Sequence, residues 1–148
     1  MQRRLVLGVC APLHGAVARL STRPGDLTVV SPEPLPPDTG GSKVTHERSR
    51  PDDASAYPTR ADFVLVATDD GGTNAAVATA AREAFPDAHL VVYVGLDADA
   101  AIRSRVDAVA DRVIDAERAL TDRLGDLTAG AGAERLHRLY ATLRRIDG

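Results

Sequence analysis

Residues 61–74 read ADFVLVATDDGGTN. The unbroken apolar run from Phe63 to Ala67 predicts a strand buried on both faces, because a half-exposed strand would alternate apolar and polar residues. The two aspartates and two glycines that follow are typical of a tight turn. An Ala-rich segment up to Phe85 then predicts a helix. This order of strand, turn and helix is the repeating unit of a parallel α/β sheet.

The helix predicted after this turn is expected to bury one apolar face against the sheet. Thr73 or the aspartate before the glycines can cap its first turn, since either side chain accepts from free N–H groups. The apolar positions that recur at helical spacing are Ala76, Val77, Ala80, Ala81 and Ala84.

Similar units lie on both sides of this segment. Further strands are predicted at residues 5–9, 27–30, 89–94 and 113–114, with a brief one at 43–46. Helices are predicted at residues 13–20, 97–110, 115–127 and 132–146, the third being broken at Gly125. Buried strands that alternate with amphipathic helices indicate a Rossmann-like α/β fold. We expect a doubly wound parallel sheet of about six strands, helices on both faces, and one or two C-terminal helices.

The domain boundaries follow from composition. Residues 1–127 are expected to form the Rossmann-like domain, interrupted at 31–60 by an excursion that contains six of the nine prolines and the Gly40-Gly41 pair. Residues 128–148 are expected to form an amphipathic helix. Its apolar stripe can dock on the flank of the sheet or form a face for self-association. The stripe consists of Leu136, Leu139, Tyr140, Leu143 and Ile146.

Composition excludes several classes of protein. Cys10 is the only cysteine among 148 residues, which excludes a disulfide framework or a cysteine-rich zinc site within one chain. The four histidines are far apart, so we expect no metal site, and no catalytic constellation stands out. A net charge of −3 argues against nucleic-acid binding. Without a signal peptide or a long apolar run, we expect a cytoplasmic protein that does not insert into membranes.

The turn after the first strand is the usual phosphate site of such folds. A dinucleotide turn has the pattern GxGxxG, but here only Gly8 is in register, and Cys10 and Leu13 take the other glycine positions. Pro12 removes a backbone N–H that could meet a phosphate. The second strand ends at Ser31, whereas an acidic ribose ligand is expected there, and Glu33 is displaced behind a proline. These departures favour a structural turn over a dinucleotide site.

The turn after residues 63–67 carries the stronger signal. Small and polar side chains gather there at the start of a helix, where N–H groups are unpaired. They can contact the ribose or adenosine of a nucleotide, or they can simply cap the helix, and the two roles are compatible. The residues are Thr68, Asp69, Asp70, Thr73 and Asn74.

The segment from Ala61 to Asn74 resembles the fourth-strand region of TrkA-N domains, the N-terminal halves of RCK regulators of potassium channels and transporters. The strand at 89–94 and the segment at 110–115 are similar to the next two strands of that family. The resemblance implies a Rossmann-like domain that dimerises and binds NAD(H), ATP or a related adenine nucleotide as a control signal, without being an enzyme. A transporter is then an expected partner. The candidate ligand-binding residues are Gly8, Cys10, Ala11, Gly15, Ser31, Thr68, Asp69 and Asn74.

The C-terminal part has a second resemblance. The segments at 115–120 and 135–148 look like the junction that joins a TrkA-N domain to a DHH-family phosphoesterase. This implies a regulatory half without the catalytic domain, and a phosphoesterase as a partner. The sequence thus leaves two functions open: a nucleotide-sensing regulatory domain linked to potassium transport, or a ligand-free module that dimerises or docks on a catalytic partner.

Overall fold

The computed structural model describes residues 2–37, 39 and 43–129. The chain divides into two compact units, Met1–Ile114 and Asp115–Gly148. Within the described residues, no helix combines the length and the apolar character needed to cross a membrane.

A six-stranded sheet forms the centre of the first unit. Its strands lie in the order β3-β2-β1-β4-β5-β6, and the registered pairs are all parallel. The chain therefore winds outward from β1 in one direction and then from β4 in the other, which is the Rossmann arrangement predicted from the sequence. The strands are β1 (Arg3–Leu7), β2 (Asp26–Val30), β3 (Val44–Glu47), β4 (Phe63–Val66), β5 (His89–Val94) and β6 (Arg112–Asp115).

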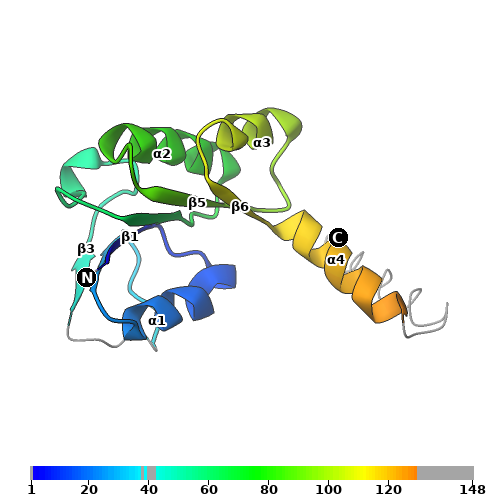
Figure 1. The fold of residues 1–148 in the computed structure, drawn as a ribbon, viewed down its shortest axis with the longest axis horizontal. Coiled ribbons are helices and arrows are strands. Elements are labelled where there is room, and N and C mark those ends of the chain that lie inside the picture. Colours follow the sequence, from blue (N-terminus) through cyan, green and yellow to red (C-terminus); the bar gives the residue numbers. More distant parts are fainter. Residues whose placement is uncertain (1, 38, 40–42, 130–148) are drawn as a thin grey trace. The chain divides into compact units, whose positions relative to one another are not determined.

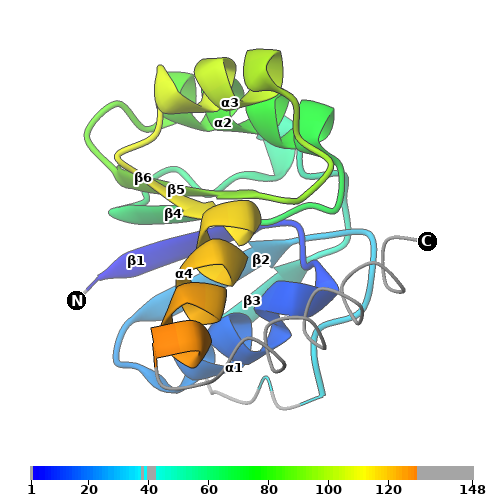
Figure 2. The same ribbon diagram turned by 90° about the vertical axis from the view of Figure 1, so that its right-hand side faces the viewer.

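Helices cover both faces of this sheet. Helix α1 (His14–Thr22), which follows the 3-10 turn η1 (Ala11–Leu13), lies on one face, and α2 (Gly71–Ala84) and α3 (Ala100–Asp107) lie on the other (Figure 1). The view turned by 90° shows the same division, with α2 and α3 adjacent (Figure 2). Two layers of helix thus keep the continuous apolar strands away from water, as an all-parallel sheet requires.

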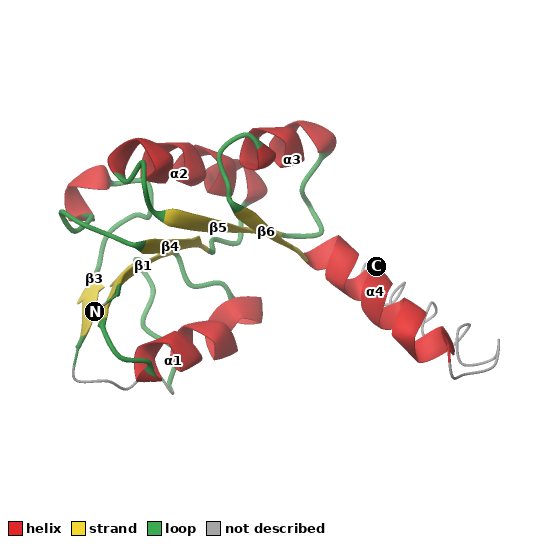
Figure 3. Cartoon of the chain, in the orientation of Figure 1, coloured by secondary structure: helices red, strands yellow, loops and turns green. Residues whose placement is uncertain are grey.

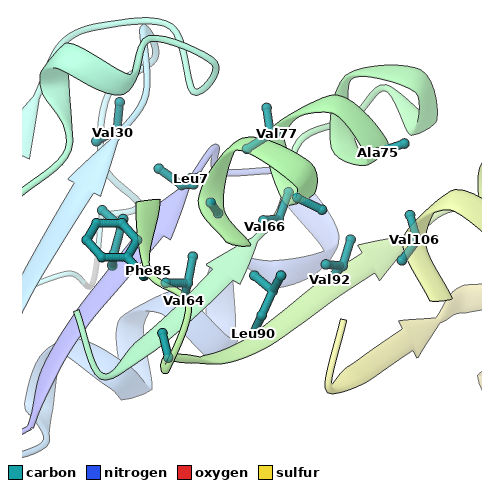
Figure 4. Close-up of a cluster of buried hydrophobic side chains, with 14 of the residues drawn as sticks. Leu7, Val30, Val64, Val66, Ala75, Val77, Phe85, Leu90, Val92 and Val106 are labelled. Atoms are coloured by element: carbon teal, nitrogen blue, oxygen red, sulfur yellow. The ribbon is translucent and has the colours of Figure 1, made fainter. Parts of the chain in front are cut away.

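Each face of the sheet has its own apolar core. The core under α2 and α3 combines strand residues such as Val64 and Val92 with Ala75 and Ala78 of α2, and includes Phe85 and Val106 (Figure 4). The core under α1 contains Val6, Val29 and Val17, and Cys10 packs within it. Small helix residues facing branched strand residues allow α2 to approach the sheet closely.

The predicted buried face of α2 is partly wrong. Ala76 and Ala84 are exposed, whereas Ala75 and Ala78 are buried, so the helix is rotated from the expected phase. Because alanines occur on every side of this helix, hydrophobicity does not define one face. The buried polar residue Asn74 and the close packing of Gly71 on Ile102 of α3 mark the true face.

The second unit begins at the capped helix α4 (Ala116–Ala129). Asp115 Oδ1 accepts from the N–H groups of Glu117 and Arg118 at 3.0 and 3.3 Å. The predicted break at Gly125 is wrong, because the helix continues through it. One exposed glycine costs about 1 kcal/mol, which does not end a helix. The division after Ile114 precedes the boundary expected after residue 127, and residues 130–148 of the predicted last helix lie outside the described residues.

The long connection from β2 to β4 contains β3, which the sequence predicted as a brief strand, and the short turn η2 (Ala54–Ala56) (Figure 3). Its second half is held by side chains. The Tyr57 hydroxyl donates to Pro51 O at 2.5 Å, and the Tyr57 ring stacks on Phe85 with centroids 6.2 Å apart. Asp53 accepts from the Ser49 hydroxyl and from the Ser55 N–H. These contacts give the loop a defined course beside the sheet.

The amino ends of β1 and β2 border a basic hollow. Its charged lining residues are Arg3, Arg4, Arg60 and Asp26. Arg4 is only 5% exposed, and its guanidinium donates to Leu20 O at 2.8 Å and to Pro24 O. Leu20 O belongs to the last turn of α1, where the helix dipole favours a cation. Arg4 therefore anchors the end of α1.

Candidate functional site

A pocket lies at the carboxyl edge of the sheet, where β1 and β4 run side by side and the winding direction reverses. Ligands of doubly wound folds bind at this topological switch point. The pocket has a volume of about 200 Å³. It is lined by Gly8, Val9, Ser31, Pro32, Glu33, Pro51, Thr68, Asp69, Asp70 and Thr73. These residues come from the turns after β1, β2 and β4, from the β3 to β4 connection and, for Thr73, from the first turn of α2.

Gly8 is required by the geometry of the first turn. Its φ angle is +88°, a left-handed conformation that residues with a Cβ rarely adopt. A Cβ at this position would lie 2.7 Å from Thr68 Cγ2 and 3.1 Å from Ala67 O. Gly8 therefore allows the ends of β1 and β4 to approach each other closely, and it lines the pocket at this point.

Four backbone N–H groups of this first turn donate to other main-chain atoms. The Gly8 N–H donates to Val30 O at 2.9 Å, and the Cys10 N–H donates to Ala67 O at 2.9 Å. The Leu13 N–H donates to Cys10 O, and the His14 N–H donates to Ala11 O. The turn is thus tied to both neighbouring strands and to η1.

Cys10 faces the core and lies outside the pocket lining. It is 1% exposed, and burial raises the pKa of its thiol above the ordinary value. A buried thiol with a raised pKa is mostly protonated near neutral pH and is a poor nucleophile.

The turn after β2 is fixed around Ser31. The Ser31 N–H donates to Glu47 O, and its carbonyl oxygen lies 3.1 Å from His46 Nε2, so both groups connect β2 to the end of β3. Ser31 Oγ accepts from the Glu33 N–H at 3.1 Å. This local hydroxyl-to-backbone turn folds the chain back and brings Glu33 to the pocket despite the intervening proline.

The turn after β4 is held by a network centred on Asn74, which is 2% exposed. Asn74 Oδ1 accepts from the Thr68 N–H at 2.9 Å and from the Thr68 hydroxyl at 2.5 Å. Its Nδ2 group donates to Thr68 O and to Tyr93 O, both at 3.0 Å. All hydrogen-bonding groups of the amide are engaged, so Asn74 fixes Thr68 at the pocket and joins the ends of β4 and β5.

Asp70 caps helix α2. Its Oδ1 atom accepts from the N–H groups of Gly72 and Thr73 at 2.8 and 3.2 Å. The carboxylate also faces the positive end of the helix dipole. Asp69, beside it, is exposed and lines the same pocket. The prediction that an aspartate of this turn caps the helix is therefore confirmed, and this aspartate, Asp70, also lines the pocket.

The structure brings together four of the eight candidate ligand-binding residues. Gly8, Ser31, Thr68 and Asp69 all line the pocket. The other four lie elsewhere: Cys10 is buried in the α1 core, Ala11 lies in η1, Gly15 lies on the exposed first turn of α1, and Asn74 is buried behind Thr68. Ligand contact by any of these residues stays a prediction.

Sequence reasoning missed several lining residues. Glu33 was discounted because of its displacement from the end of β2, and the turn at Ser31 is what brings it back. Pro51 reaches the pocket from a distant loop, and no local pattern marks it. Among the residues that the structure describes, no group of three or more His, Cys, Asp or Glu side chains is arranged to hold a metal ion.

Comparison with known proteins supports the fold. No protein-family model matches the chain, and neither does any curated protein sequence. Among solved structures, the chain is similar to the TrkA-N domain of the inner membrane protein YbaL from Escherichia coli, with a TM-score of 0.62 and 17% sequence identity. The match covers 86% of this chain and 96% of that domain. The chain therefore has the fold of a TrkA-N domain.

Proposed function

We propose that this protein is a non-catalytic regulatory domain that binds the adenosine part of a nucleotide at the switch-point pocket and signals its presence to a partner. The single observation that carries the proposal is the pocket itself, formed by Gly8, Ser31, Thr68 and Asp69 at the carboxyl ends of β1, β2 and β4. Open α/β sheets bind ligands at this position. The described pocket lining contains no nucleophilic side chain that is hydrogen-bonded to a general base, so sensing fits the site better than catalysis.

Thermal unfolding in the presence of candidate ligands tests the binding function. The panel consists of adenosine, AMP, ADP, ATP, NAD and NADH. A ligand present at 100 times its dissociation constant stabilises the folded state by about 2.7 kcal/mol. Stabilisation by at least one compound supports the proposal, and Ser31→Ala should reduce it. If no compound in the panel stabilises the protein, the sensing function is wrong.

The proposed partners are a second copy of the chain and a membrane transport system, with potassium as the transported ion. Two points support this: the structural neighbour is a domain of an inner membrane protein, and α4 has leucines at 120, 124 and 127 on one face, of which the first and last are exposed. Sedimentation equilibrium tests the dimer. Potassium uptake, measured in cells with and without the protein, tests the link to transport.

A ligand-free docking module is the second candidate. It is favoured by the first turn, where the N–H groups of Gly8, Cys10, Leu13 and His14 already donate to main-chain oxygens. This function predicts no stabilisation by any nucleotide or nucleoside, together with a stable dimer or a complex with a phosphoesterase. The ligand panel and sedimentation therefore separate the two candidates.

A further inference from the structure

If the switch-point pocket binds a nucleotide or nucleoside, as proposed above, its charge determines which of these ligands it binds best. Three carboxylates lie in the lining, on Glu33, Asp69 and Asp70, and all three residues are exposed toward solvent. None of the described lining residues is Lys, Arg or His. A phosphate group that entered this pocket would meet negative charge without a cationic side chain to offset it.

The first turn offers little to offset that charge. Rossmann sites bind pyrophosphate through N–H groups at the start of the first helix. Here the Leu13 and His14 N–H groups are used within η1, and Pro12 has none. Gly8 and Cys10 donate to the neighbouring strands. Four N–H groups of this turn that could meet a phosphate are therefore engaged within the protein.

The N-terminus of α2 already has a carboxylate bound to it, that of Asp70. Asp70 Oδ1 already accepts from the Gly72 and Thr73 N–H groups, which are the donors that an incoming phosphate would need. A phosphate could reach them only by displacing Asp70, and it would then lie beside two free carboxylates, those of Asp69 and Asp70. Both helix starts at the switch point are thus unfavourable to phosphate.

The same groups suit uncharged hydroxyls. A carboxylate such as Glu33 accepts from the two hydroxyls of a ribose, as the acidic residue of nucleotide-binding folds does. Ser31, buried at the edge of the lining, accepts from the Glu33 N–H through its hydroxyl oxygen and so holds Glu33 at the pocket. Val9, Pro32 and Pro51 add apolar surface for a flat base.

The size of the pocket agrees with this chemistry. Its volume of about 200 Å³ is below the range of about 300–1,000 Å³ that is common for drug-sized ligands. We infer that the pocket selects a nucleoside without phosphate groups, neutral or cationic, over nucleotides and dinucleotides.

A series of adenosine derivatives that differ only at the 5′ position tests the inference. The compounds are 5′-amino-5′-deoxyadenosine, adenosine and AMP, which carry a positive, a neutral and a negative substituent. Isothermal titration should give affinities in that order, with AMP at least about tenfold weaker than adenosine, because its phosphate meets the carboxylates of the lining without a cationic side chain to offset them. Shifts of the Gly8, Ser31 and Thr68 amide resonances in a ¹⁵N spectrum locate the binding in this pocket.

The outcomes separate the inference from the proposed function. If AMP, ATP or NAD binds in the pocket as tightly as adenosine or more tightly, the inference is overturned while the sensing function stands. If none of these compounds shifts the pocket resonances, both fail. Raising the salt concentration should weaken the discrimination against AMP and leave adenosine binding unchanged, because salt screens exposed charges.

Neutral variants test whether the carboxylates cause the selection. Asp69→Asn should strengthen AMP binding several-fold relative to adenosine binding, because the substitution removes a negative charge that repels the phosphate. Asp87→Asn is the matched control, since Asp87 is exposed and lies between α2 and β5 at the other edge of the sheet. Equal effects of the two substitutions on AMP binding would contradict a local role of Asp69.

Discussion

The two turns that flank the switch point are built in different ways. The turn after β1 is held by backbone: Gly8 at positive φ, N–H groups that donate to neighbouring strands, and a helix start without a side-chain cap. The turn after β4 is held by side chains, with Asn74 and Asp70 making most of its bonds. The first turn thus depends on one glycine, whereas the second spreads its stability over several polar groups. Substitutions should therefore affect the two turns differently.

Gly8→Ala should have the largest effect. The added Cβ needs an unfavourable φ and overlaps Thr68 Cγ2, so we expect the free energy of unfolding to fall by about 3–5 kcal/mol. Urea unfolding followed by circular dichroism measures this. Gly15→Ala is the control, because no atom lies within 4 Å of its added Cβ, and it should stabilise helix α1 by about 0.5–1 kcal/mol. Similar stabilities of the two variants would contradict the close approach at Gly8.

Asn74→Ala should have the next largest effect. It removes hydrogen bonds to Thr68 and leaves Tyr93 O without its amide donor in a buried site. We expect a loss of about 2–3 kcal/mol in the same measurement. Thr79→Ala on the exposed side of the same helix removes one hydroxyl bond to Ala75 O, and its effect should stay within about 0.5 kcal/mol. A loss at Asn74 as small as that at Thr79 would show that the network adds little.

Asp70→Ala should cost less, because it removes only the cap of α2. The expected loss is about 1 kcal/mol. Asp70→Ser retains a capping oxygen and should restore most of the stability without the charge. If the serine variant is as unstable as the alanine variant, the effect comes from something other than capping.

Tyr57→Phe should have the smallest effect at neutral pH, about 0.5–1 kcal/mol, because it removes the bond to Pro51 O and keeps the ring on Phe85. Burial raises the pKa of Tyr57 from 10.0 to about 12. The folded state therefore holds the proton more tightly than the unfolded state, and this contribution to stability is present below pH 10 and lost as the pH rises toward 12. Unfolding measured from pH 9 to 12 should show a shallower decline for the variant. An identical decline would mean that Tyr57 ionises as freely in the folded state.

Much of the fold could be predicted because its strands are continuous apolar runs, such as Phe63–Val66, which only a sheet covered on both faces can bury. The phase of α2 could not, since its alanines mark no single face and the position of Asn74 decides it. The break predicted at Gly125 was also wrong, because one exposed glycine costs too little to end helix α4.

The candidate site was predictable only in part, because some of its residues reach the pocket through contacts that no local sequence pattern marks. Gly8, Ser31, Thr68 and Asp69 follow strands, so their place at the carboxyl edge follows from topology. Glu33 and Pro51 reach the pocket through a hydroxyl-to-backbone turn and a loop anchored by Tyr57, and both depend on contacts formed only after folding.

The basic hollow with its buried Arg4 gives strand β1 a further property. Arginines surround the amino end of this five-residue strand, and carboxylates surround the pocket at its carboxyl end. A strand of this length spans about 15 Å. The strand therefore separates a basic region from an acidic region. We expect anions to be attracted to the amino end of the sheet and cations to the carboxyl end.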